Sequence, residues 1–522
     1  MIKIIIRTIG YVKYKFSLIF ATKENFKKFK IDFKNSKIEK ILEEISKTDI
    51  KLDHFSFLDK SLTKEQIHNC YNQILGEKIL KRFQLSPYIF FSYYISLKKL
   101  IIPLPNEFLT IFVKNGIEIN FFLSNIFLRI KCFFNLIYFF IRCNIRILQI
   151  FRQKYENLRD SIFIYDDVSD SHLNPKYGKN LFEWIKNNFN VEKVFSHNLL
   201  VNVKKKNLFY SKNNYLPPIK KYHIINLFIF NIYLFFCLLF KQFTSRNYLM
   251  ALSYEEYFKL YIFDKSNKSN LFKIYLFTTS FMNLKPLWAL YVENKKLSTI
   301  EFVNYSASYQ YNNNKYLQFG INRQNWNKRY EIDDSYINYL IKNVEYKSEY
   351  IFDKSIYYSN SDERIKFRNY IAIFDHLVWN EDFLARSLVE NNDFLDTYAA
   401  EYVKNVLDVC KKLNFKVILK SKRVKWHIKK YHNYLNELKD KNFESFDILY
   451  DKSIYEVAKY SHISITAPFT SAAIMSRNYG FKSIYFDYSN KYILNSSKLN
   501  YGITTLFGNK ELRNYLIKNF KK

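Results

Sequence analysis

Two short stretches near the C-terminal end of the chain carry side chains that suit the binding of a phosphate group. The first follows the apolar run Phe415–Leu419 and holds three cations, Lys420, Lys422 and Arg423. The second is Pro468-Phe469-Thr470-Ser471, which joins an apolar run to a segment with helical spacing. Cationic side chains make short, charge-assisted hydrogen bonds to phosphate oxygens. A helix start with a hydroxyl residue and small residues behind it offers free backbone N–H groups to an anion.

Each stretch also has an ordinary structural interpretation, which the sequence leaves open. In so basic a chain, three cations together can form a solvated turn. Thr470 or Ser471 can be an N-cap that bonds only to its own helix. Asp487 follows a further apolar run, and we count it with the candidate phosphate site. The pattern Ser453-Ile-Tyr-Glu456 matches a capping box, so we interpret Glu456 as structural.

Apolar runs and helical segments alternate regularly beyond residue 365. A strand-helix alternation predicts a parallel sheet with helices on both faces. Ligands of such sheets bind at the carboxyl ends of the strands, which is where the candidate residues lie. The predicted strands are Asn369–Phe374, Phe415–Leu419, Phe446–Leu449, Ile463–Thr466 and Lys482–Phe486, and the predicted helices are Asp393–Leu413, Trp426–Leu438, Ile454–Tyr460, Ser471–Asn478 and Glu511–Asn519.

A second α/β region is predicted upstream. The apolar run Ser161–Tyr165 ends at Asp166 and Asp167, with His172 close behind. Paired aspartates after a strand can also be a solvated turn or a helix cap. Further predicted elements are a helix at Tyr177–Asn188, strands at Ile2–Ile6, Leu271–Thr278 and Ile300–Tyr305, a helix at Lys34–Ser46 and a loop at Asn314–Trp326.

Composition excludes several classes of protein. The chain has 522 residues, of which 48% are hydrophobic, so it can bury a large core and is not disordered. Its five cysteines include no CxxC pair, which gives no support to a disulfide framework or a zinc site and fits a reduced, cytosolic protein. Arg7 and Lys13 interrupt the apolar N-terminus, so we predict no signal peptide.

Two apolar stretches lack acidic residues altogether. Ile119–Tyr155 contains six basic residues and predicts an aromatic, basic amphipathic helix, the pattern of a segment in a membrane interface. Ile224–Phe240 is 17 residues without a charge, flanked by Lys220, Lys221 and Lys241. That length is at the short limit for crossing a bilayer, so we favour a monotopic or re-entrant attachment to anionic lipid. A fully buried helix is the alternative for both stretches.

Several matches in order resemble bacterial surface-carbohydrate biosynthesis proteins, which have a GT-B-like glycosyltransferase architecture. The matching stretches are LKSKR (Leu419–Arg423), APFTSAA (Ala467–Ala473), KSIYFDYS (Lys482–Ser489) and, upstream, Leu284–Ser306. Two departures concern the site: Ser421 replaces the usual proline of the phosphate turn, and Tyr488-Ser489-Asn490 replaces a Pro-Thr-Gly-like turn. The first 155 residues or so match nothing that we can name.

The resemblance implies an α/β protein with two Rossmann-like domains facing a cleft. Together with the pattern along the chain, it gives an N-terminal α/β extension with a basic amphipathic helix (1–155), an N-terminal Rossmann-like acceptor domain with the apolar helix 224–240 (156–365) and a C-terminal nucleotide-sugar domain (366–522). It implies transfer of a sugar from a nucleotide-sugar donor to a glycan or lipid-linked glycan of a lipopolysaccharide or capsule, without a metal or other cofactor. Asp166, Asp167 and His172 are then the candidates for the base that deprotonates the acceptor hydroxyl. The expected location is cytoplasmic, peripheral at the inner face of the plasma membrane.

Three other functions stay open at this point. A teichoic-acid-type polyol-phosphate transferase shares the fold and the basic helical region. An inactive partner subunit is possible because the phosphate turn is altered. The net charge of +33 also suits a nucleic-acid-binding protein, but we recognise no reader motif, and the acid-free stretches coincide with apolar runs, so we expect no nucleic-acid partner.

Overall fold

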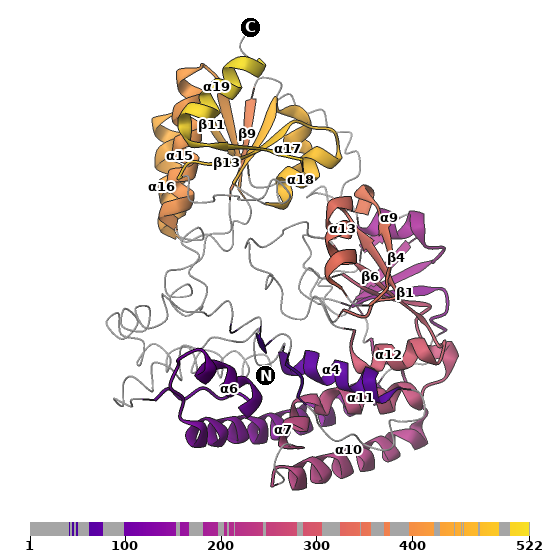
Figure 1. Cartoon of the computed structure of the whole chain (residues 1–522). Helices are drawn as coiled ribbons and strands as arrows, with labels where there is room; N and C mark the ends of the chain where they lie inside the picture. The colour runs from indigo at the N-terminus through magenta and orange to yellow at the C-terminus, as the bar shows by residue number, and fades with distance from the viewer. Residues whose placement is uncertain are drawn as a thin grey trace.

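The computed structural model covers the whole chain (Figure 1), and the description that follows is confined to part of it. The described residues are 41, 44–45, 48–50, 62–76, 99–152, 157–165, 181–196, 203–205, 208–212, 215–243, 247–278, 285–304, 324–344, 346–356, 370–375, 396–421, 429–442, 444–449, 452, 454–467, 470–489 and 502–520.

The first sheet lies in the middle third of the chain and has eight strands. Every neighbouring pair is parallel except β3 and β4, which form an antiparallel pair at one edge. The spatial order is β3-β4-β2-β1-β5-β6-β7-β8. The strands are β1 (Ser161–Tyr165), β2 (Lys193–Ser196), β3 (Val203–Lys205), β4 (Leu208–Lys212), β5 (Ile274–Phe277), β6 (Thr299–Val303), β7 (Lys328–Glu331) and β8 (Glu349–Phe352).

The second sheet has six strands, all parallel, in the order β11-β10-β9-β12-β13-β14. They are β9 (Tyr370–Phe374), β10 (Lys416–Lys420), β11 (Phe446–Leu449), β12 (Ile463–Thr466), β13 (Ser483–Asp487) and β14 (Thr504–Phe507). Counted along the chain, this order is 3-2-1-4-5-6, the order of a Rossmann-like sheet. The parallel strands of the first sheet follow the same rule. Two Rossmann-like domains in tandem make the fold α/β and GT-B-like, as the resemblance implied.

Alternate side chains of the second sheet face different helices. Ile371 and Ile373 pack with α15 (Asp396–Lys412) and α19 (Gly508–Phe520). Ala372 and Phe374 instead pack with α17 (Ile454–Tyr460) and α18 (Ser471–Asn478). Both faces are therefore covered, which is why the central strands are nearly continuous apolar runs. The remaining helix of this domain is α16 (Lys429–Lys441).

The first sheet is also covered on both faces. Ile162 and Ile164 belong to an apolar cluster with α9 (Leu181–Asn188) that also includes Ile474 of α18, so one core crosses from domain to domain. Phe163 belongs to a second cluster, which is shared with a layer of helices. That layer contains α4 (Lys64–Gly76), α6 (Asn106–Lys114), α7 (Phe121–Phe151), α10 (Lys221–Lys241), η4 (Asn247–Ser253), α11 (Tyr254–Asp264) and α12 (Leu287–Asn294). The shorter elements of the first domain are η5 (Lys268–Asn270), α13 (Asp334–Asn343) and η7 (Lys354–Ile356).

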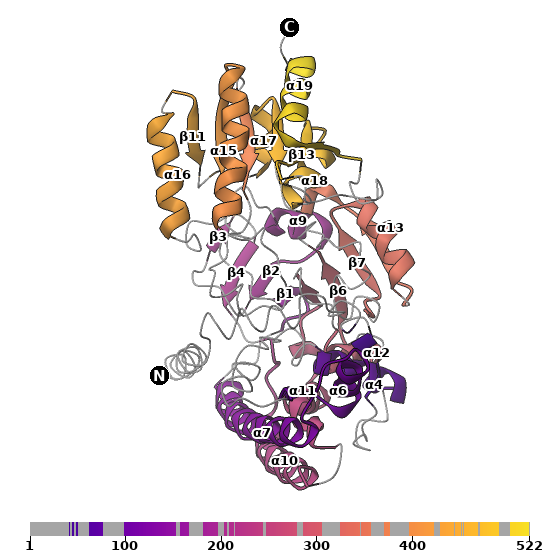
Figure 2. The same cartoon turned by 60° about the vertical axis from the view of Figure 1, so that its left-hand side comes forward.

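The helices α7 and α10 lie side by side at the far end of the molecule from the second sheet (Figures 1 and 2). Three contacts show that they are antiparallel: Arg129 reaches Gln242, Phe140 packs on Phe235, and Asn144 bonds Asn231. The helices α11 and α12 lie between this pair and the first sheet (Figures 1 and 2).

The structure confirms several predicted elements and corrects others. Ser161–Tyr165, Phe446–Leu449, Ile454–Tyr460, Ile463–Thr466 and Ser471–Asn478 have the predicted bounds. The helix predicted at 177–188 is confirmed over Leu181–Asn188, its first four residues lying outside the described part, and the strand predicted at 271–278 is limited to Ile274–Phe277. The strands β7 and β8 were not predicted. The predicted strand at 2–6 and most of the loop at 314–326 lie outside the described residues, and within 34–46 only Ile41, Glu44 and Ile45 are described, all helical.

Three basic residues of α7 have partners within the protein. Arg146 and Arg142 pair with Glu255 of α11, and Arg129 donates to the backbone oxygen of Gln242. These three cations attach α7 to the rest of the protein, because their partners belong to other helices. Glu255 is in α11, and Gln242 is at the end of α10.

Candidate functional site

The carboxyl edge of the second sheet brings the predicted phosphate-binding stretches together. Phe374 of β9 pairs with Lys420 of β10 on one side and with Thr466 of β12 on the other. The chain leaves all three strands at the same level because the strands are parallel. The stretch Lys420–Arg423, which contains three cations, is called the cation turn. This turn and the start of α18 therefore flank the end of β9, at the point where strand order reverses. Ligands of open α/β sheets bind at this reversal point.

A buried carboxylate positions the cation turn. Ser421 donates from its hydroxyl to Asp375 Oδ2 over 3.0 Å, and the Tyr431 hydroxyl donates to the same oxygen over 3.4 Å. The N–H of Ser421 donates to the carbonyl of Leu449 over 3.1 Å. All three polar residues are buried, which makes the link a fixed part of the sheet edge. A proline at 421 could make neither bond of Ser421, so this departure from the family pattern has a structural role.

The cations themselves are only partly described. Lys420 is half-buried, and its Nζ donates to the carbonyl of Ser421 over 2.7 Å. Lys422 and Arg423 lie outside the described residues, so their phosphate-binding role stays a prediction. The structure shows where the turn begins, because Ser421 at the carboxyl end of β10 is hydrogen-bonded to Asp375.

The start of α18 has backbone donors that its own residues do not occupy. Thr470 is the N-cap residue, with extended backbone angles (φ −76°, ψ 146°), yet its side chain caps no helical N–H. Its Oγ1 is buried and has no hydrogen-bond partner among the described residues. The next residues, Ser471, Ala472 and Ala473, add little bulk, and the two alanines are buried. A helix N-terminus with an idle hydroxyl can bind an anion there. Pro468 and Phe469 lie outside the described residues.

Asp487 is occupied by its own turn. The residue is fully buried, and its Oδ1 accepts from the N–H of Ser489 over 2.9 Å and from the hydroxyl of Ser489 over 2.7 Å. This is the local pattern by which an aspartate shapes the turn after a strand. Its assignment to the nucleotide site stays a prediction, and any such role would act through the shape of this turn.

The first domain was expected to supply the base, but Asp166, Asp167 and His172 lie outside the described residues. The described part of this domain contains a pair that sequence reasoning missed. Lys285, fully buried before α12, donates to Glu293 Oε2 over 2.6 Å. Burial lowers the pKa of Lys285 and raises the pKa of Glu293, so desolvation outweighs the attraction between the two charges. Nothing in the sequence indicated this pair, because a spacing of eight residues matches no motif.

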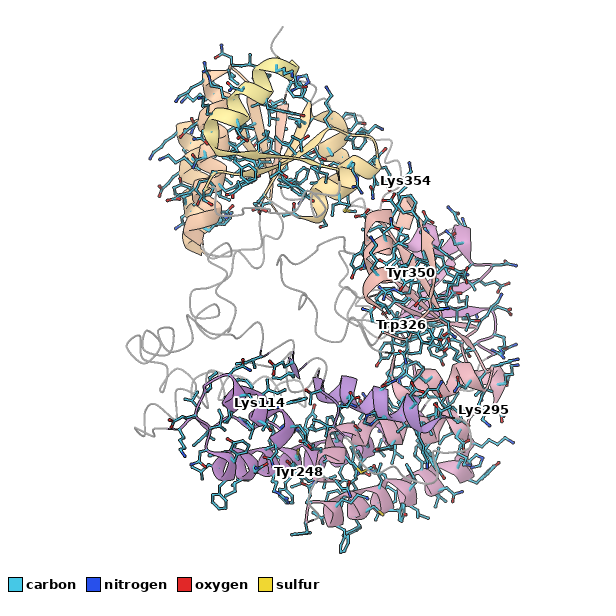
Figure 3. All side chains as sticks on the ribbon, viewed as in Figure 1. Lys114, Tyr248, Lys295, Trp326, Tyr350 and Lys354 are labelled. Carbon is cyan, nitrogen blue, oxygen red and sulfur yellow. The ribbon has the colours of Figure 1, made fainter. Side chains whose placement is uncertain are left out.

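A second buried pair lies on β7. Arg329 donates to Glu331 Oε1 from Nε over 2.9 Å and from Nη2 over 2.6 Å, and both side chains are inside the protein. Arg329 also lies over the ring of Phe302, 4.6 Å from its centroid. Glu331 accepts a further bond from Asn304 over 2.7 Å. Burial raises the pKa of Glu331, while Arg329 opposes that rise. Figure 3 shows Trp326 and Tyr350 in this part of the first domain.

The two domains meet at the other end of α18. Arg477 donates to Asp333 Oδ1 over 2.8 Å, and Asn478 donates to the carbonyl of Ile332 over 2.5 Å. Tyr479 donates from its hydroxyl to the carbonyl of Lys354 over 2.6 Å. A helix of eight residues is about 12 Å long. The free helix start and the domain contact are therefore one short helix apart.

Within the described part of the chain, no group of three or more His, Cys, Asp or Glu side chains is placed to hold a metal ion.

A family model described as "Polysaccharide biosynthesis PFTS motif protein" matches residues 232–516. The match covers more than half of the chain and includes Pro468-Phe469-Thr470-Ser471, the four residues that spell the motif. No curated protein sequence matches the chain.

Among solved structures, the chain is similar to the UDP-GlcNAc 2-epimerase from Methanocaldococcus jannaschii, with a TM-score of 0.35, 10% identity and coverage of 69% of this chain and 91% of that one. The glycotransferase of kitacinnamycin gives a TM-score of 0.31 and 8% identity, covering 69% and 90%. A trehalose-6-phosphate synthase gives 0.34 and 8%, covering 69% and 91%. These are distant likenesses, and the fold assignment above depends on the strand orders.

Proposed function

The chain belongs to the polysaccharide biosynthesis PFTS motif family, and from that premise we propose that it is a glycosyltransferase. It moves a sugar from a nucleotide-sugar donor to a growing bacterial surface glycan, an O-antigen of lipopolysaccharide or a capsule. The observation that carries the proposal is the place of the motif. Thr470 and Ser471 begin α18 directly beyond β12, the strand next to β9 at the reversal point of a Rossmann-like sheet.

The donor phosphates are proposed to bind between the start of α18 and the turn after β10. The first N–H groups of α18 and the idle Thr470 hydroxyl donate to phosphate oxygens, and Lys422 and Arg423 add positive charge. Negative charge builds up on the leaving phosphate as the glycosidic bond to the nucleotide breaks. Fixed donors at that position stabilise this charge without a metal ion.

The acceptor is proposed to bind on the first domain. Its sheet has the same strand order, with β1 and β5 at the reversal point, and Asp166, Asp167 and His172 follow β1 in sequence. One of these side chains takes the proton of the acceptor hydroxyl as that oxygen attacks the anomeric carbon. A lipid-linked acceptor would bring the enzyme to the cytoplasmic face of the plasma membrane.

The experiment is a donor screen followed by a product assay. Purified protein is heated with UDP-, GDP- and CMP-sugars in turn, and we expect one nucleotide class to raise the melting temperature because a ligand that binds only the folded state stabilises it. The selected donor is then incubated with lipid-linked glycan acceptors, and the product mass shows what was added. A sugar increment supports the proposal. A glycerol- or ribitol-phosphate increment identifies a polyol-phosphate transferase, and no binding by any nucleotide sugar overturns the proposal.

A further inference from the structure

The helix pair α7–α10 presents an apolar surface to the outside of the molecule. On α7, every exposed residue within Phe121–Phe151 except Gln149 is aliphatic or aromatic. On α10, Lys221 and Asn226 are the exposed residues that are neither aliphatic nor aromatic. The surface consists of Phe122, Ile126, Ile130, Phe133, Phe134, Tyr138, Ile141, Leu148 and Phe151 of α7, Tyr222, Ile225, Phe228, Ile229, Tyr233, Phe236 and Phe240 of α10, and Phe243 just beyond. Figure 3 shows side chains extending from this end of the molecule.

The opposite side of the pair is attached firmly to the protein. Leu227, Asn231, Leu234 and Leu238 of α10 are buried at spacings of three and four residues, which marks one inward stripe. Asn231 accepts from the Tyr254 hydroxyl through both its backbone oxygen (2.9 Å) and its Oδ1 (2.8 Å). The outward residues are therefore not needed for packing against the protein core, because a different side of α10 already packs there.

By length and composition, α10 is the one helix among the described residues that could cross a membrane, and 22% of its apolar window is buried. Its attachments argue against crossing. The chain enters α10 from Tyr215–Ile219 and leaves it into η4, and both segments are buried in the same helical layer. A helix that crosses the bilayer has its two ends on opposite sides of a hydrocarbon layer about 30 Å thick. Both ends of α10 instead connect to the same helical layer, so both should lie on the same side of a membrane.

We infer that the α7–α10 pair lies flat in one leaflet of a membrane, with its outward face in the acyl region and the rest of the enzyme in water. Neither helix contains an acidic residue, and Arg152, Lys220, Lys221 and Lys241 stand at the helix ends, where anionic headgroups would meet them. The attachment is mainly apolar, since Arg129, Arg142 and Arg146 are engaged by partners within the protein, although the side chain of Arg142 is 43% exposed. The inference about the surface does not depend on the proposed activity.

A lipid bilayer suits this surface better than a second protein chain. Protein interfaces carry about one hydrogen bond per 100–200 Å² and a polar rim. Apart from the tyrosine hydroxyls, the exposed side chains of the two helices that could make such bonds are Gln149, Asn226, Lys221 and Arg142, and Arg142 already pairs with Glu255. A surface with so few polar groups offers little to a protein partner and matches hydrocarbon.

The first test is co-sedimentation with vesicles of phosphatidylcholine alone or with phosphatidylglycerol. Wild type is expected to sediment with both, more strongly with the anionic lipid, and to stay partly bound in high salt. The double variant Phe228→Ser/Phe236→Ser should lose at least tenfold in vesicle affinity. Its matched control is Ile341→Ser/Phe352→Ser, which removes two exposed apolar residues from α13 and β8 and should bind as wild type does.

Unchanged binding of the Phe228/Phe236 variant overturns the inference. So does a wild type that ignores vesicles and forms a dimer that the same variant dissociates, since the surface is then an interface between copies. Circular dichroism of both variants establishes that they are folded. If the serine variant is unfolded, Phe228→Tyr/Phe236→Tyr is measured instead and should bind more weakly than wild type.

The second test decides between lying flat and crossing. Lys220→Cys and Phe243→Cys place a thiol at either end of α10, and each is treated with a membrane-impermeant maleimide in inverted and in right-side-out vesicles. The native cysteines are buried or half-buried, and wild type gives their background. Both new thiols should react from the same side. Reaction of the two from opposite sides overturns the flat arrangement. Sugar transfer to a soluble acceptor analogue is measured in parallel, so that a failed transferase assay and a failed membrane assay stay distinguishable.

Discussion

Arg477, in the last turn of α18, donates a hydrogen bond of 2.8 Å to the carboxylate of Asp333, which follows β7. This bond joins the helix that begins at the PFTS motif to the other Rossmann-like domain. Asp333 is almost fully buried, whereas Arg477 is 25% exposed. The contact is thus neither a surface ion pair nor a fully buried one, and its energy should lie between those limits.

Replacing Arg477 with Met should lower the free energy of unfolding by about 2 kcal/mol, because the buried Asp333 loses a cation. Urea unfolding of the variant measures this. The matched control is Lys439→Met, which breaks a pair of 2.7 Å with Asp447 in which both partners are largely exposed and should cost less than 1 kcal/mol. Equal costs for the two variants would contradict the assigned role of Asp333.

Ser421→Pro would restore the proline of the family pattern, and we expect it to destabilise this protein. The proline would remove the bond from the Ser421 N–H to Leu449 and the bond from its hydroxyl to Asp375. Asp375 would lose a buried donor, so the expected cost is about 2–3 kcal/mol. Ser421→Ala keeps the N–H and should cost about 1–2 kcal/mol. Thermal melting of both variants checks the order. A more stable proline variant would mean that this clamp does not hold the turn.

Reversing the charge at Lys422 or Arg423 should weaken binding of the donor. Hydrogen bonds to charged groups contribute about 1.5–3 kcal/mol, so we expect a loss of about ten- to a hundredfold in affinity. Isothermal titration with UDP, GDP and CMP measures the loss. Lys412→Glu makes the same charge change at the end of α15, near the amino edge of the sheet, and should leave the affinity unchanged. A normal affinity in both Lys422→Glu and Arg423→Glu would remove this turn from the site.

The start of α18 can be tested by separating activity from stability. Thr470 makes no capping bond, so Thr470→Ala should change the free energy of unfolding by less than about 0.5 kcal/mol while lowering donor affinity. Ser471→Leu adds bulk beside the free N–H groups and should lower activity further. Thr504→Leu, at the amino end of β14, is the control for an added leucine. If Thr470→Ala costs stability and leaves affinity intact, the helix start is only a scaffold.

The buried pair on β7 predicts a pH dependence. Arg329→Met should cost about 3–5 kcal/mol near neutral pH, since Glu331 stays buried with its charge uncompensated. The raised pKa of Glu331 should rise further, so the folded state binds a proton more readily than the unfolded one. Stability from this group is then gained as pH falls through the raised value and lost as pH rises. The deficit against wild type should be smaller near pH 5 than near pH 8.

The fold could be read from the sequence where burial alone decides it. The runs at β1 and β9 are largely apolar on both faces, and β12 is fully buried although Ser464 and Thr466 alternate with its isoleucines, so the bounds of all three were predicted to within a residue. The strand β7 reads Lys-Arg-Tyr-Glu, and its two buried charges compensate each other, which hides a buried strand behind a hydrophilic sequence. The predicted domain boundaries stay predictions.

The site could be predicted only to the level of strand ends. The sequence places Lys420 and Thr470 at strand carboxyl ends, and a parallel sheet brings such ends together. It does not indicate that Ser421 would bond an aspartate 46 residues earlier, or that the Thr470 hydroxyl would have no partner within the part of the chain that the structure describes. Nor does the sequence indicate that Arg142 and Arg146 of α7 pair with Glu255, because that residue belongs to a different helix.

The outward face of α7 and α10 also governs how the protein behaves in a test tube. In buffer without lipid or detergent, seventeen large apolar side chains on that face have only water to contact. Self-association through this face would then increase with protein concentration and disappear when a mild detergent is added. Particle sizes measured without detergent would therefore reflect non-specific self-association and not a functional oligomer. Crystals grown in the presence of detergent should contain detergent molecules around the α7–α10 pair.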